Sequence, residues 1–518
     1  MSEQKPYYIT TPIYYVNDAP HIGHAYTTLA CDVLARFKRL DGFDVKFLTG
    51  TDEHGQKVEK SAEKAGIDPQ AFTDQVSQNF RDLAVSMNFT NDDFIRTTEE
   101  RHKISCRDIW QRLLDAGEIY LDSYSGWYSV RDEAFFGEGE LTLGDDGKKI
   151  APSGAEVEWV EEPSYFFKLS EWQGRLMDFY NANPEFILPL TRRNEVTSFV
   201  EGGLQDLSVS RTSFKWGVPV PNDDDHIMYV WLDALTNYIT AIGYPDTDHA
   251  EYQKYWPADV HMVGKDILRF HAVYWPAFLM AAGLEPPKRV FAHGWWTNEG
   301  EKISKSLGNV IDPLELMATY GLDQVRYFLL REVPFGNDGD FSRAAMVQRM
   351  NGELANDFGN LAQRVLSMIN KNCDAKVPEP GDLTDDDNTL LSAVDGLLEV
   401  VRDALDVQAF HIALEKIWTE IRAANSYIDR QAPWTLKKED PQRMQTVLYV
   451  LAEAIRQLAL LAQPFVPEAA GRMLDQVAAA EDARDFSSFG EAGRLTPSTE
   501  LPKPEGVFPR FVEEESAP

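Results

Sequence analysis

An expected strand, loop and helix at the start of the chain constrain the fold more than any other feature. Residues 7–9 form an apolar run, residues 11–24 carry the Pro, Asn and Gly that interrupt regular structure, and residues 25–40 follow an amphipathic helical period. This order is typical of the first unit of a doubly wound parallel sheet. Such sheets bind ligands beyond the carboxyl ends of their strands, where helix N-termini attract phosphate. The sequence places His21 and His24 at that point.

A second short apolar run, at residues 44–50, is followed closely by the carboxylate of Asp52. Because neighbouring parallel strands end at the same edge of a sheet, we expect Asp52 to face the same crevice as the histidines. There it is suited to hold an ammonium group through a charge-assisted hydrogen bond. The alternative is that Asp52 caps the helix expected at residues 56–65.

Two lysines, Lys302 and Lys305, stand with two serines in a short segment far along the chain. Alone, such a segment is usually a solvated surface turn, and a histidine pair at a helix start is usually bonded to the backbone. Both of these alternatives lose weight when the two segments are found in one sequence.

The net charge of the chain limits the ways in which it can bind a nucleic acid. With 83 acidic and 50 basic residues, the formal net charge is −33, opposite to what a nonspecific nucleic-acid binder needs. An RNA partner must therefore be held by local basic and aromatic patches, and its binding should weaken strongly as salt increases. The alternative is an acidic protein with no RNA partner.

The cysteines and the apolar runs indicate the compartment. The three cysteines are widely spaced and odd in number, which fits a reducing compartment and excludes a disulfide framework. The N-terminus lacks a signal sequence, and no uninterrupted apolar run approaches the length of a membrane span. A cytoplasmic protein without membrane contact is expected.

The histidine and lysine segments resemble the two signatures of a known enzyme class. The sequence His-Ile-Gly-His at 21–24 is identical to the first signature of the class I aminoacyl-tRNA synthetases, and Lys-Ile-Ser-Lys-Ser at 302–306 resembles the second, with Ile where Met is usual. The resemblance implies that the catalytic residues are His21, His24, Lys302 and Lys305. It also implies an ATP site bordered by His21, Gly23, His24, Gly264, Asp266, His293, Gly294, Lys302 and Lys305, with Asp266 on the ribose.

Two later segments, residues 228–238 and 260–271, resemble the methionyl members of this class more than any other specificity. The resemblance implies that Asp52 binds the amino group of methionine. It implies a surrounding pocket of Ile13, Tyr15, Trp231, Ala234, Leu235, Tyr238, Ile267 and His271, in which Leu235 replaces a proline found in many members. An unbranched thioether is best recognised by such apolar and aromatic walls. On spacing alone, the stripe of Trp231, Ala234 and Tyr238 is more typical of core packing.

The hydrophobic pattern changes several times along the chain, and an α/β protein with an added helix bundle is expected. The catalytic part is a Rossmann-like, doubly wound parallel sheet interrupted by an inserted connective peptide, and the bundle is all-α. The expected boundaries are 1–117 and 225–293 for the two halves of the catalytic domain, 118–224 for the insertion, 294–349 for the lysine loop and stem-contact region, 350–480 for the helical anticodon-binding domain and 481–518 for a tail. The last residues of the tail have a disordered composition.

By the same resemblance, Asn360, Arg364 and Trp434 in the expected bundle contact the tRNA anticodon. A tryptophan that follows a proline could stack on an unpaired base, and Arg and Asn can bond its edge. The alternative is that Trp434 packs against the end of the bundle while Arg364 is solvated.

The insertion lacks the cysteines with which many methionyl members bind zinc, so no structural zinc is predicted. It is also too short to resemble a hydrolytic editing domain. The additional C-terminal dimerisation module of longer family members is absent as well, which favours a monomer.

These features together predict a methionine–tRNA ligase. Its substrates would be methionine, ATP with Mg²⁺, and tRNA(Met). Three alternatives remain: a related nucleotidyl-transferring enzyme, a synthetase of another specificity, and a catalytically inactive paralogue that binds RNA or regulates.

Overall fold

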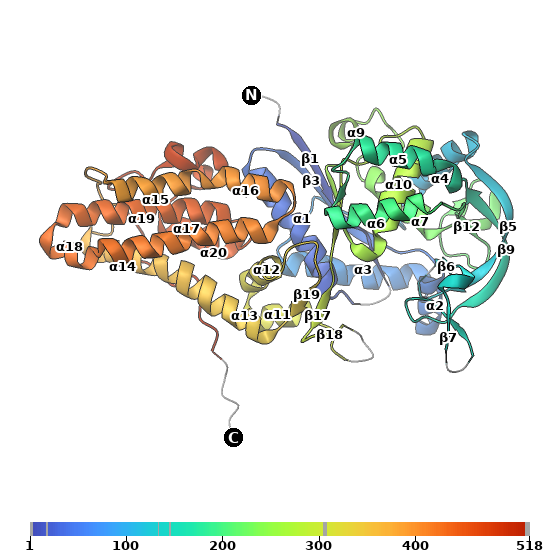
Figure 1. Cartoon of the computed structure of the whole chain (residues 1–518), viewed down its shortest axis with the longest axis horizontal. Helices are drawn as coiled ribbons and strands as arrows, with labels where there is room; N and C mark the ends of the chain where they lie inside the picture. Colours follow the sequence, from blue (N-terminus) through green and yellow to red (C-terminus); the bar gives the residue numbers. More distant parts are fainter. Residues whose placement is uncertain (1–3, 17–18, 133, 145–146, 304–307, 513–518) are drawn as a thin grey trace, which may run out of the picture. The chain divides into compact units, whose positions relative to one another are not determined.

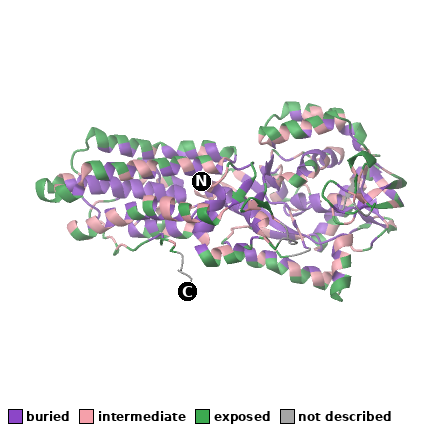
Figure 2. Cartoon of the chain, turned by 60° about the horizontal axis from the view of Figure 1, so that its bottom comes forward, coloured by how far each residue is buried: buried purple, intermediate pink, exposed green. Residues whose placement is uncertain are grey.

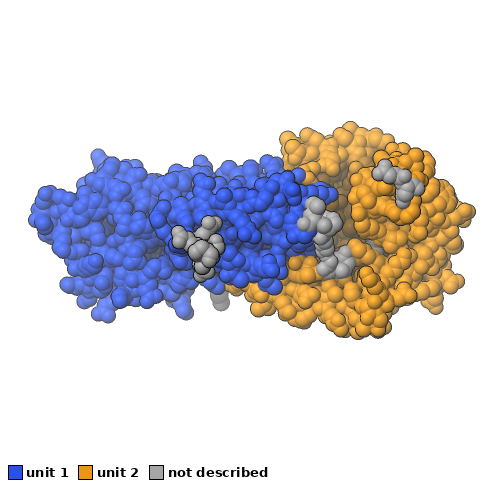
Figure 3. All heavy atoms as spheres, turned by 90° about the horizontal axis from the view of Figure 1, so that it is seen from below, with its two compact units in different colours: residues 1–5, 21–45, 293–518 blue, residues 6–20, 46–292 orange. Residues whose placement is uncertain are grey.

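The computed structural model (Figure 1) describes residues 4–16, 19–132, 134–144, 147–303 and 308–512 of the chain. The chain divides into two units, coloured separately in Figure 3. Unit 1 comprises residues 1–5, 21–45 and 293–518, and unit 2 comprises residues 6–20 and 46–292. Each unit contains its own large set of buried apolar side chains.

A seven-stranded sheet forms the framework of unit 2. Its strand order is β10-β16-β15-β1-β3-β2, with β4 also paired to β3, and the pairs β1–β15, β10–β16, β2–β3 and β3–β4 are parallel. The strands are β1 (Pro6–Thr10), β2 (Tyr14–Tyr15), β3 (Asp44–Asp52), β4 (Asp93–Arg96), β10 (Ile187–Leu188), β15 (Val260–Gly264) and β16 (Val290–His293). The predicted parallel-sheet fold class is confirmed.

The strand order reverses direction at β1. From β1 the chain proceeds through β3 to β4 on one side, and β15 and β16 follow on the other side. The carboxyl ends of β1 and β15 are therefore neighbours, at the point where doubly wound sheets bind their ligands. The segment that follows β1 carries Ile13 and Tyr15, and the segment that follows β15 carries Asp266 and His271.

The edge strand β10 was not predicted, because it lies inside the region expected to be a separate insertion. Ile187 pairs with Val290 and Leu188 with Phe291, so the insertion contributes one strand to the central sheet. Two apolar residues are too few for a recognisable strand pattern in the sequence.

Most of the insertion consists of antiparallel strands and two helices. A four-stranded sheet has the order β11-β9-β5-β6, and ten consecutive residue pairs join its two long strands, β5 and β9. The elements are β5 (Ile119–Ser129), β6 (Ala134–Phe136), β9 (Glu158–Phe167), β11 (Leu207–Ser208), α5 (Gln173–Ala182) and α6 (Leu190–Glu201). The insertion is therefore built largely from antiparallel strand pairs.

The helices that carry the predicted pocket and its surroundings range from single turns to α3, which has 18 residues. They are α2 (Gln56–Ala65), α3 (Pro69–Ser86), α4 (Glu100–Asp115), α7 (Val230–Leu235), α8 (Asn237–Thr240), α9 (Ala250–Tyr255), η3 (Lys265–Ile267), the π-helical η4 (Phe270–Tyr274) and α10 (Trp275–Ala281). Large aromatic side chains fill the core between these helices and the sheet; Trp110 and Trp275 are fully buried.

Unit 1 consists mainly of helices. They are α1 (Ile22–Leu40), α11 (Pro313–Tyr320), α12 (Leu322–Arg331), α13 (Arg343–Gln348), the π-helical η6 (Arg349–Gly359), α14 (Asn360–Asn372), α15 (Asp385–Asp395), α16 (Leu397–Asp406), α17 (Phe410–Gln431), α18 (Pro433–Glu439), α19 (Pro441–Ala462) and α20 (Pro467–Gln476). A small sheet of β18 (Glu301–Lys302), β17 (Trp296–Asn298) and β19 (Gly339–Phe341) precedes the bundle. The predicted helical bundle is confirmed.

The central helix of the bundle is α19, which is flanked by α14, α15, α17, α18 and α20. Its length and mean hydropathy of 1.2 are those of a helix able to cross a membrane, although the sequence contains no uninterrupted apolar run of that length. In the fold, 94% of its most apolar window is buried, and Figure 2 shows this buried interior. The apolar composition is accounted for by the core of the bundle.

Helix α1 is anchored to the rest of unit 1 by ion pairs. The fully buried guanidinium of Arg326 donates to Asp32 at 2.7 Å and to the carbonyl oxygens of Phe465 and Pro464. Near the other end of α1, Lys38 pairs with Asp406 at 2.7 Å. The helix that begins at the histidine motif is thus held along its length by α12 and the bundle.

The C-terminal tail folds back on the bundle as far as residue 512. Phe508 is buried, and the side-chain amide of Asn351 exchanges two hydrogen bonds with the backbone of Phe511. The expected disorder of the last residues concerns 513–518, which lie outside the described residues.

Candidate active site

The two predicted catalytic histidines form a reciprocal cap at the start of α1. The Nδ1 atom of His21 accepts a hydrogen bond from the backbone N–H of Gly23 at 3.1 Å, and Nδ1 of His24 accepts one from the N–H of His21 at 3.1 Å. The ring centroids lie 3.9 Å apart. The backbone-bonded arrangement considered as an alternative to a chemical role is therefore present.

This capping leaves each imidazole suited to bind an anion. A neutral imidazole whose Nδ1 accepts a hydrogen bond carries its proton on Nε2. Burial, with a smaller contribution from His21, lowers the pKa of His24 well below its usual value, so His24 is neutral. An N–H donor at a helix N-terminus reinforces the backbone N–H groups and the helix dipole that attract phosphate there.

Two glycines of the predicted ATP site are needed for close packing. A Cβ atom at Gly23 would lie 2.9 Å from Cε1 of His21, and one at Gly294 would lie 2.2 Å from the carbonyl oxygen of Asn337. Any side chain at these positions would displace the imidazole or the backbone that faces it.

Within unit 1, His293 is hydrogen-bonded to Thr27, in the second turn of α1. Its Nδ1 lies 2.8 Å from the carbonyl oxygen of Gly294, and its Nε2 lies 2.7 Å from the hydroxyl of Thr27, which is also 3.0 Å from the carbonyl oxygen of Gly23. The ring of Tyr26 packs edge-on against the imidazole. Unit 1 therefore brings His21, Gly23, His24, His293 and Gly294 together.

The lysine segment is only partly described. Lys302 is exposed at the end of β18, where it pairs with Thr297 of β17, and its carbonyl oxygen accepts from the side chain of Asn309. Lys305, the other predicted catalytic lysine, lies outside the described residues.

In unit 2, a chain of hydrogen bonds orients two residues of the predicted methionine pocket. The hydroxyl of Tyr238 lies 2.7 Å from Nε2 of His271, and Nδ1 of His271 lies 2.9 Å from the carbonyl oxygen of Ile267. Because a carbonyl oxygen can only accept, Nδ1 carries the proton and Nε2 accepts from the tyrosine. Tyr238 is held in turn by His261, whose ring stacks on it at 4.0 Å.

The remaining pocket residues of unit 2 lie in or beside one apolar cluster. Leu235 and Tyr238 belong to the buried core, and Ile13 and Ile267 pack against it. The ring of Trp231 stacks on Phe270 with centroids 3.4 Å apart. The helical segment is interrupted at Thr236, between α7 and α8, so the stripe of Trp231, Ala234 and Tyr238 spans two short helices.

The burial of His271 has a measurable consequence for stability. Burial lowers its pKa to about 4, although the bond to the Ile267 carbonyl and the charge of Asp266 oppose this. The folded protein therefore binds this proton more weakly than the unfolded chain, whose histidine titrates near 6.5. The resulting stability is fully present above about pH 6.5 and is lost as the pH falls through about 4.

We therefore expect wild-type protein to lose more stability between about pH 7 and pH 4 than a His271→Gln variant, by an amount on the order of 3 kcal/mol. Urea unfolding of both proteins at several pH values measures the difference, in which the other titrating groups cancel. Parallel curves for the two proteins would contradict the assignment of a neutral, buried imidazole.

Asp52 ends β3, where it stands opposite Tyr15 of β2. Its side chain is buried, and the residue is 6% exposed. The N-cap residue of α2 is Gly55, three residues after Asp52. A buried carboxylate at the carboxyl end of a central strand suits the binding of a cation.

A buried network beside Asp52 was not predicted. One carboxylate oxygen of Asp233 lies 2.6 Å from Nδ1 of His54, and the other lies 2.8 Å from Nε2 of His102. The Sγ atom of Cys106 lies 3.2 Å from the same nitrogen of His102. Burial raises the pKa of Asp233, but the two histidines outweigh this and hold it below its usual value. The network joins α4, α7 and the loop after β3. The only local signal for this network in the sequence is Asp-Glu-His at 52–54, which contains His54.

This network also contains the one metal-compatible group found among the described residues. Potential ligand atoms of His102, Cys106 and Asp233 all lie within 4.8 Å of one another, and all three residues are buried. Their polar atoms are already bonded to one another at 2.8–3.7 Å. The arrangement is accounted for by hydrogen bonding without a metal ion.

The residues predicted to contact the anticodon lie together in unit 1. The guanidinium of Arg364 pairs with Asp429 at 2.7 Å and lies 5.5 Å from the ring centroid of Trp434. Trp434 is 47% exposed and Asn360 is exposed as well. Trp434 does not fill the bundle core, which leaves its ring accessible to a stacking partner.

Known families match almost the whole chain. A family model described as tRNA synthetases class I (M) matches residues 7–366, and one described as the anticodon binding domain of methionyl tRNA ligase matches residues 377–518. Together with the capped histidine motif and the parallel sheet, these matches define a class I tRNA synthetase.

Individual relatives specify the family more closely. A methionine–tRNA ligase of Mesorhizobium japonicum is 58% identical over 517 residues, which cover 100% of both chains, and one of Brucella melitensis is 57% identical over 99% of both. The solved structure of Mycobacterium tuberculosis methionyl-tRNA synthetase in complex with methionyl-adenylate has a TM-score of 0.96 and 56% identity, covering 98% of this chain and 100% of that chain. The chain belongs to the methionyl-tRNA synthetase family.

Proposed function

We propose that this protein is an ATP-dependent methionine–tRNA ligase that activates methionine as methionyl-adenylate and transfers it to tRNA(Met) for initiation and elongation. The observation that carries the proposal is the histidine motif, in which both imidazoles cap α1 through Nδ1 and keep the proton on Nε2. Membership of the family over the full length of the chain supports the same conclusion.

The first step joins two anions. A carboxylate oxygen of methionine attacks the α-phosphorus of ATP, the bond from that phosphorus to the bridging oxygen breaks, and pyrophosphate leaves. The nucleophile is already ionised, so no general base is needed, and the site must supply alignment and stabilisation of phosphate charge. We assign this task to His21, His24, Lys302 and Lys305. Mg²⁺ would accompany ATP, held mainly by phosphate oxygens and water.

Methionine is selected by charge at one end and by shape at the other. Asp52 binds the ammonium group, and Ile13, Tyr15, Trp231, Ala234, Leu235, Tyr238, Ile267 and His271 surround the side chain. A neutral His271 with a single accepting nitrogen, already occupied by Tyr238, adds no charge to this pocket. Apolar walls reject shorter side chains by only about 1–3 kcal/mol, so near-isosteric analogues should also be activated.

The proposed ATP-binding residues are those that the family signatures imply. Gly23, Gly264, His293 and Gly294 would border the nucleotide with the catalytic histidines and lysines. Asp266, exposed just beyond β15, would bond the ribose hydroxyls. Close backbone approach at Gly23 and Gly294 suits a phosphate or a flat base that must lie against the chain.

We further propose the expected domain boundaries at residues 117, 224, 293, 349 and 480, a monomeric state and a cytoplasmic location. The strongly negative surface supports local rather than diffuse RNA contact, because a net charge of −33 repels most of the tRNA. The contact is assigned to Asn360, Arg364 and Trp434.

Pyrophosphate exchange with each amino acid separately tests the function. Exchange with methionine alone is expected. Exchange with another amino acid would favour a synthetase of another specificity, and exchange with none would favour an inactive paralogue. Exchange with methionine but no charging of tRNA would favour a small-molecule nucleotidyl transferase.

Replacing Trp434 by alanine should lower the efficiency of tRNA charging and leave the rate of methionine activation unchanged. Loss of one stacked base costs about 1–3 kcal/mol, so kcat/KM for tRNA should fall by about five- to a hundredfold, while pyrophosphate exchange stays unchanged. Trp159, a 54% exposed tryptophan of the insertion, provides the matched control as Trp159→Ala. Equal charging by wild type and Trp434→Ala would contradict the anticodon assignment.

A further inference from the structure

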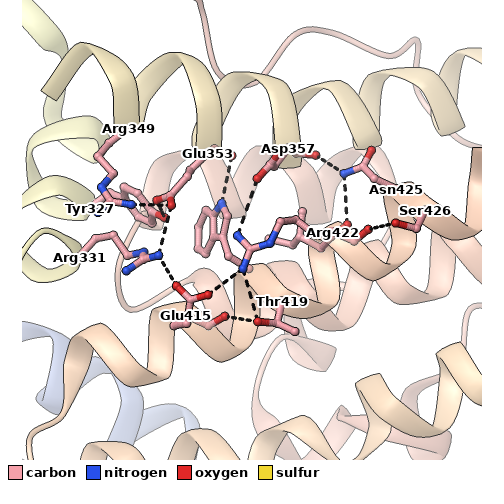
Figure 4. Close-up of polar contacts among 12 residues, drawn as sticks. Tyr327, Arg331, Arg349, Glu353, Asp357, Glu415, Thr419, Arg422, Asn425 and Ser426 are labelled. Carbon is pink, nitrogen blue, oxygen red and sulfur yellow. Dashed lines mark hydrogen bonds and ion pairs between the residues drawn. The ribbon is translucent and has the colours of Figure 1, made fainter. Parts of the chain in front are cut away.

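A network of charged side chains joins three helices of unit 1 (Figure 4). Glu353 of η6 accepts hydrogen bonds from Arg349 at 2.6 Å and from Arg331 of α12 at 3.2 Å. Arg331 also pairs with Glu415 of α17, which accepts from Arg422 at 2.8 Å. These five side chains, Arg331, Arg349, Glu353, Glu415 and Arg422, are called the helix brace.

Two buried aromatic residues hold the centre of the helix brace in place. The hydroxyl of Tyr327 donates to the Glu353 carboxylate at 2.5 Å, and the indole N–H of Trp418 donates to the Glu353 carbonyl oxygen at 3.0 Å. The two rings pack with centroids 4.5 Å apart. Glu353 is thus bonded through both its side chain and its backbone, by donors from α12 and α17.

The brace lies on a helix that leads directly to the anticodon-contacting residues. The π-helical η6 ends at Gly359, and Asn360 is the first residue of α14, which also carries Arg364. No loop separates the two segments, so a tilt or rotation of η6 would be transmitted to Asn360 and Arg364. Asp357, one turn beyond Glu353, continues the contacts: its carbonyl oxygen accepts from Asn425 of α17 at 2.9 Å.

The other end of the brace lies close in sequence to the lysine segment. Arg331 ends α12, which follows α11 with only Gly321 between them, and α11 begins eleven residues after Lys302, the last residue of β18. Within unit 1, the brace therefore sets how α14 and α17 are placed relative to α12. A folded tRNA is stiff, so its anticodon and its acceptor end cannot adjust independently to a shifted helix.

We propose that the helix brace is a positioning device for the tRNA-dependent step, holding Asn360 and Arg364 where a bound tRNA can also be charged. This inference rests on the proposed anticodon role of these residues. The alternative is that Arg331, Arg349 and Arg422 bind tRNA phosphates directly. Each of these arginines, however, already donates to a carboxylate of the brace.

Charge allows the two possibilities to be separated. Glu353→Gln and Glu415→Gln each remove one negative charge and leave all three arginines in place. If the arginines bind phosphate, both variants should charge tRNA with a higher kcat/KM, because local positive charge increases. If the brace positions α14, kcat/KM for tRNA should fall on the order of tenfold despite the favourable change in charge.

The experiment measures aminoacylation and pyrophosphate exchange for the full chain, with Asp403→Asn on the exposed side of α16 as the matched charge control. A fall in aminoacylation with unchanged exchange, absent in the control, supports the proposal. An unchanged or higher kcat/KM for tRNA overturns it, as does an equal fall in exchange, which would indicate general loss of structure. Trp434→Ala is measured in parallel: normal charging by that variant refutes the anticodon assignment itself, whereas a defect in Trp434→Ala alone refutes only the brace.

Discussion

Replacement of His24 by alanine is expected to slow methionine-dependent pyrophosphate exchange by about a hundred- to a thousandfold, the usual cost of removing one preorganised donor to developing charge. His24 is neutral and carries its proton on Nε2, since Nδ1 accepts the backbone N–H of His21. The KM for methionine should change little, because unit 2 carries the proposed methionine pocket. Steady-state exchange at varied ATP and methionine measures both quantities.

The alanine variant also removes a helix cap, and two further variants separate that effect from the chemistry. Loss of a cap costs about 1 kcal/mol of stability. His24→Asn can still accept the N–H of His21 but does not reach the position of Nε2, so it should be stable and slow. His24→Gln places an amide N–H near that position and should recover part of the rate. Full activity of His24→Asn would show that the imidazole only caps α1.

Asp52→Asn is expected to lower kcat/KM for methionine by about thirty- to five-thousandfold, since truncation of one partner of a buried charge pair costs about 2–5 kcal/mol. The side chain is buried at the end of β3, where water cannot replace the missing charge. The KM for ATP should remain near the wild-type value. Pyrophosphate exchange with methionine as the varied substrate measures the loss.

A substrate analogue provides the control for this variant. The 2-hydroxy analogue of methionine lacks the ammonium group, so wild-type protein should prefer methionine strongly as a ligand, and Asp52→Asn should lose most of that preference. Competition of the two compounds in the exchange reaction measures the ratio. A variant that retains the wild-type ratio while losing activity would show that Asp52 acts on the fold rather than on the ammonium group.

Much of the framework followed from periodicity and spacing. Strands that are buried on both faces are continuously apolar, and helices repeat every three to four residues, so the parallel sheet and the bundle were visible in the sequence. The histidine motif could be placed at a helix N-terminus for the same reason. The strand β10 was missed because Ile187 and Leu188 are too short a signal, and their pairing with β16 is a long-range contact.

Other parts of the site depended on partners that are distant in the sequence. His54 and His102 contact Asp233 from different segments of the chain, and no local sequence pattern predicts these contacts. No local pattern in the sequence marks the helix interruption at Thr236 or the π-helical turn of η4, since tertiary contacts decide where a short helix ends.

The sequence by itself determined the class of fold, the order of its elements and the types of side chain available for phosphate, ammonium and thioether binding, because these depend on local periodicity and residue chemistry. Only the tertiary structure decided the protonated nitrogen of His24 and of His271, the burial of Asp52 and the bracing of η6. Each of these depends on which atoms of remote residues come within hydrogen-bond distance, and the chain acquires such contacts only when it folds.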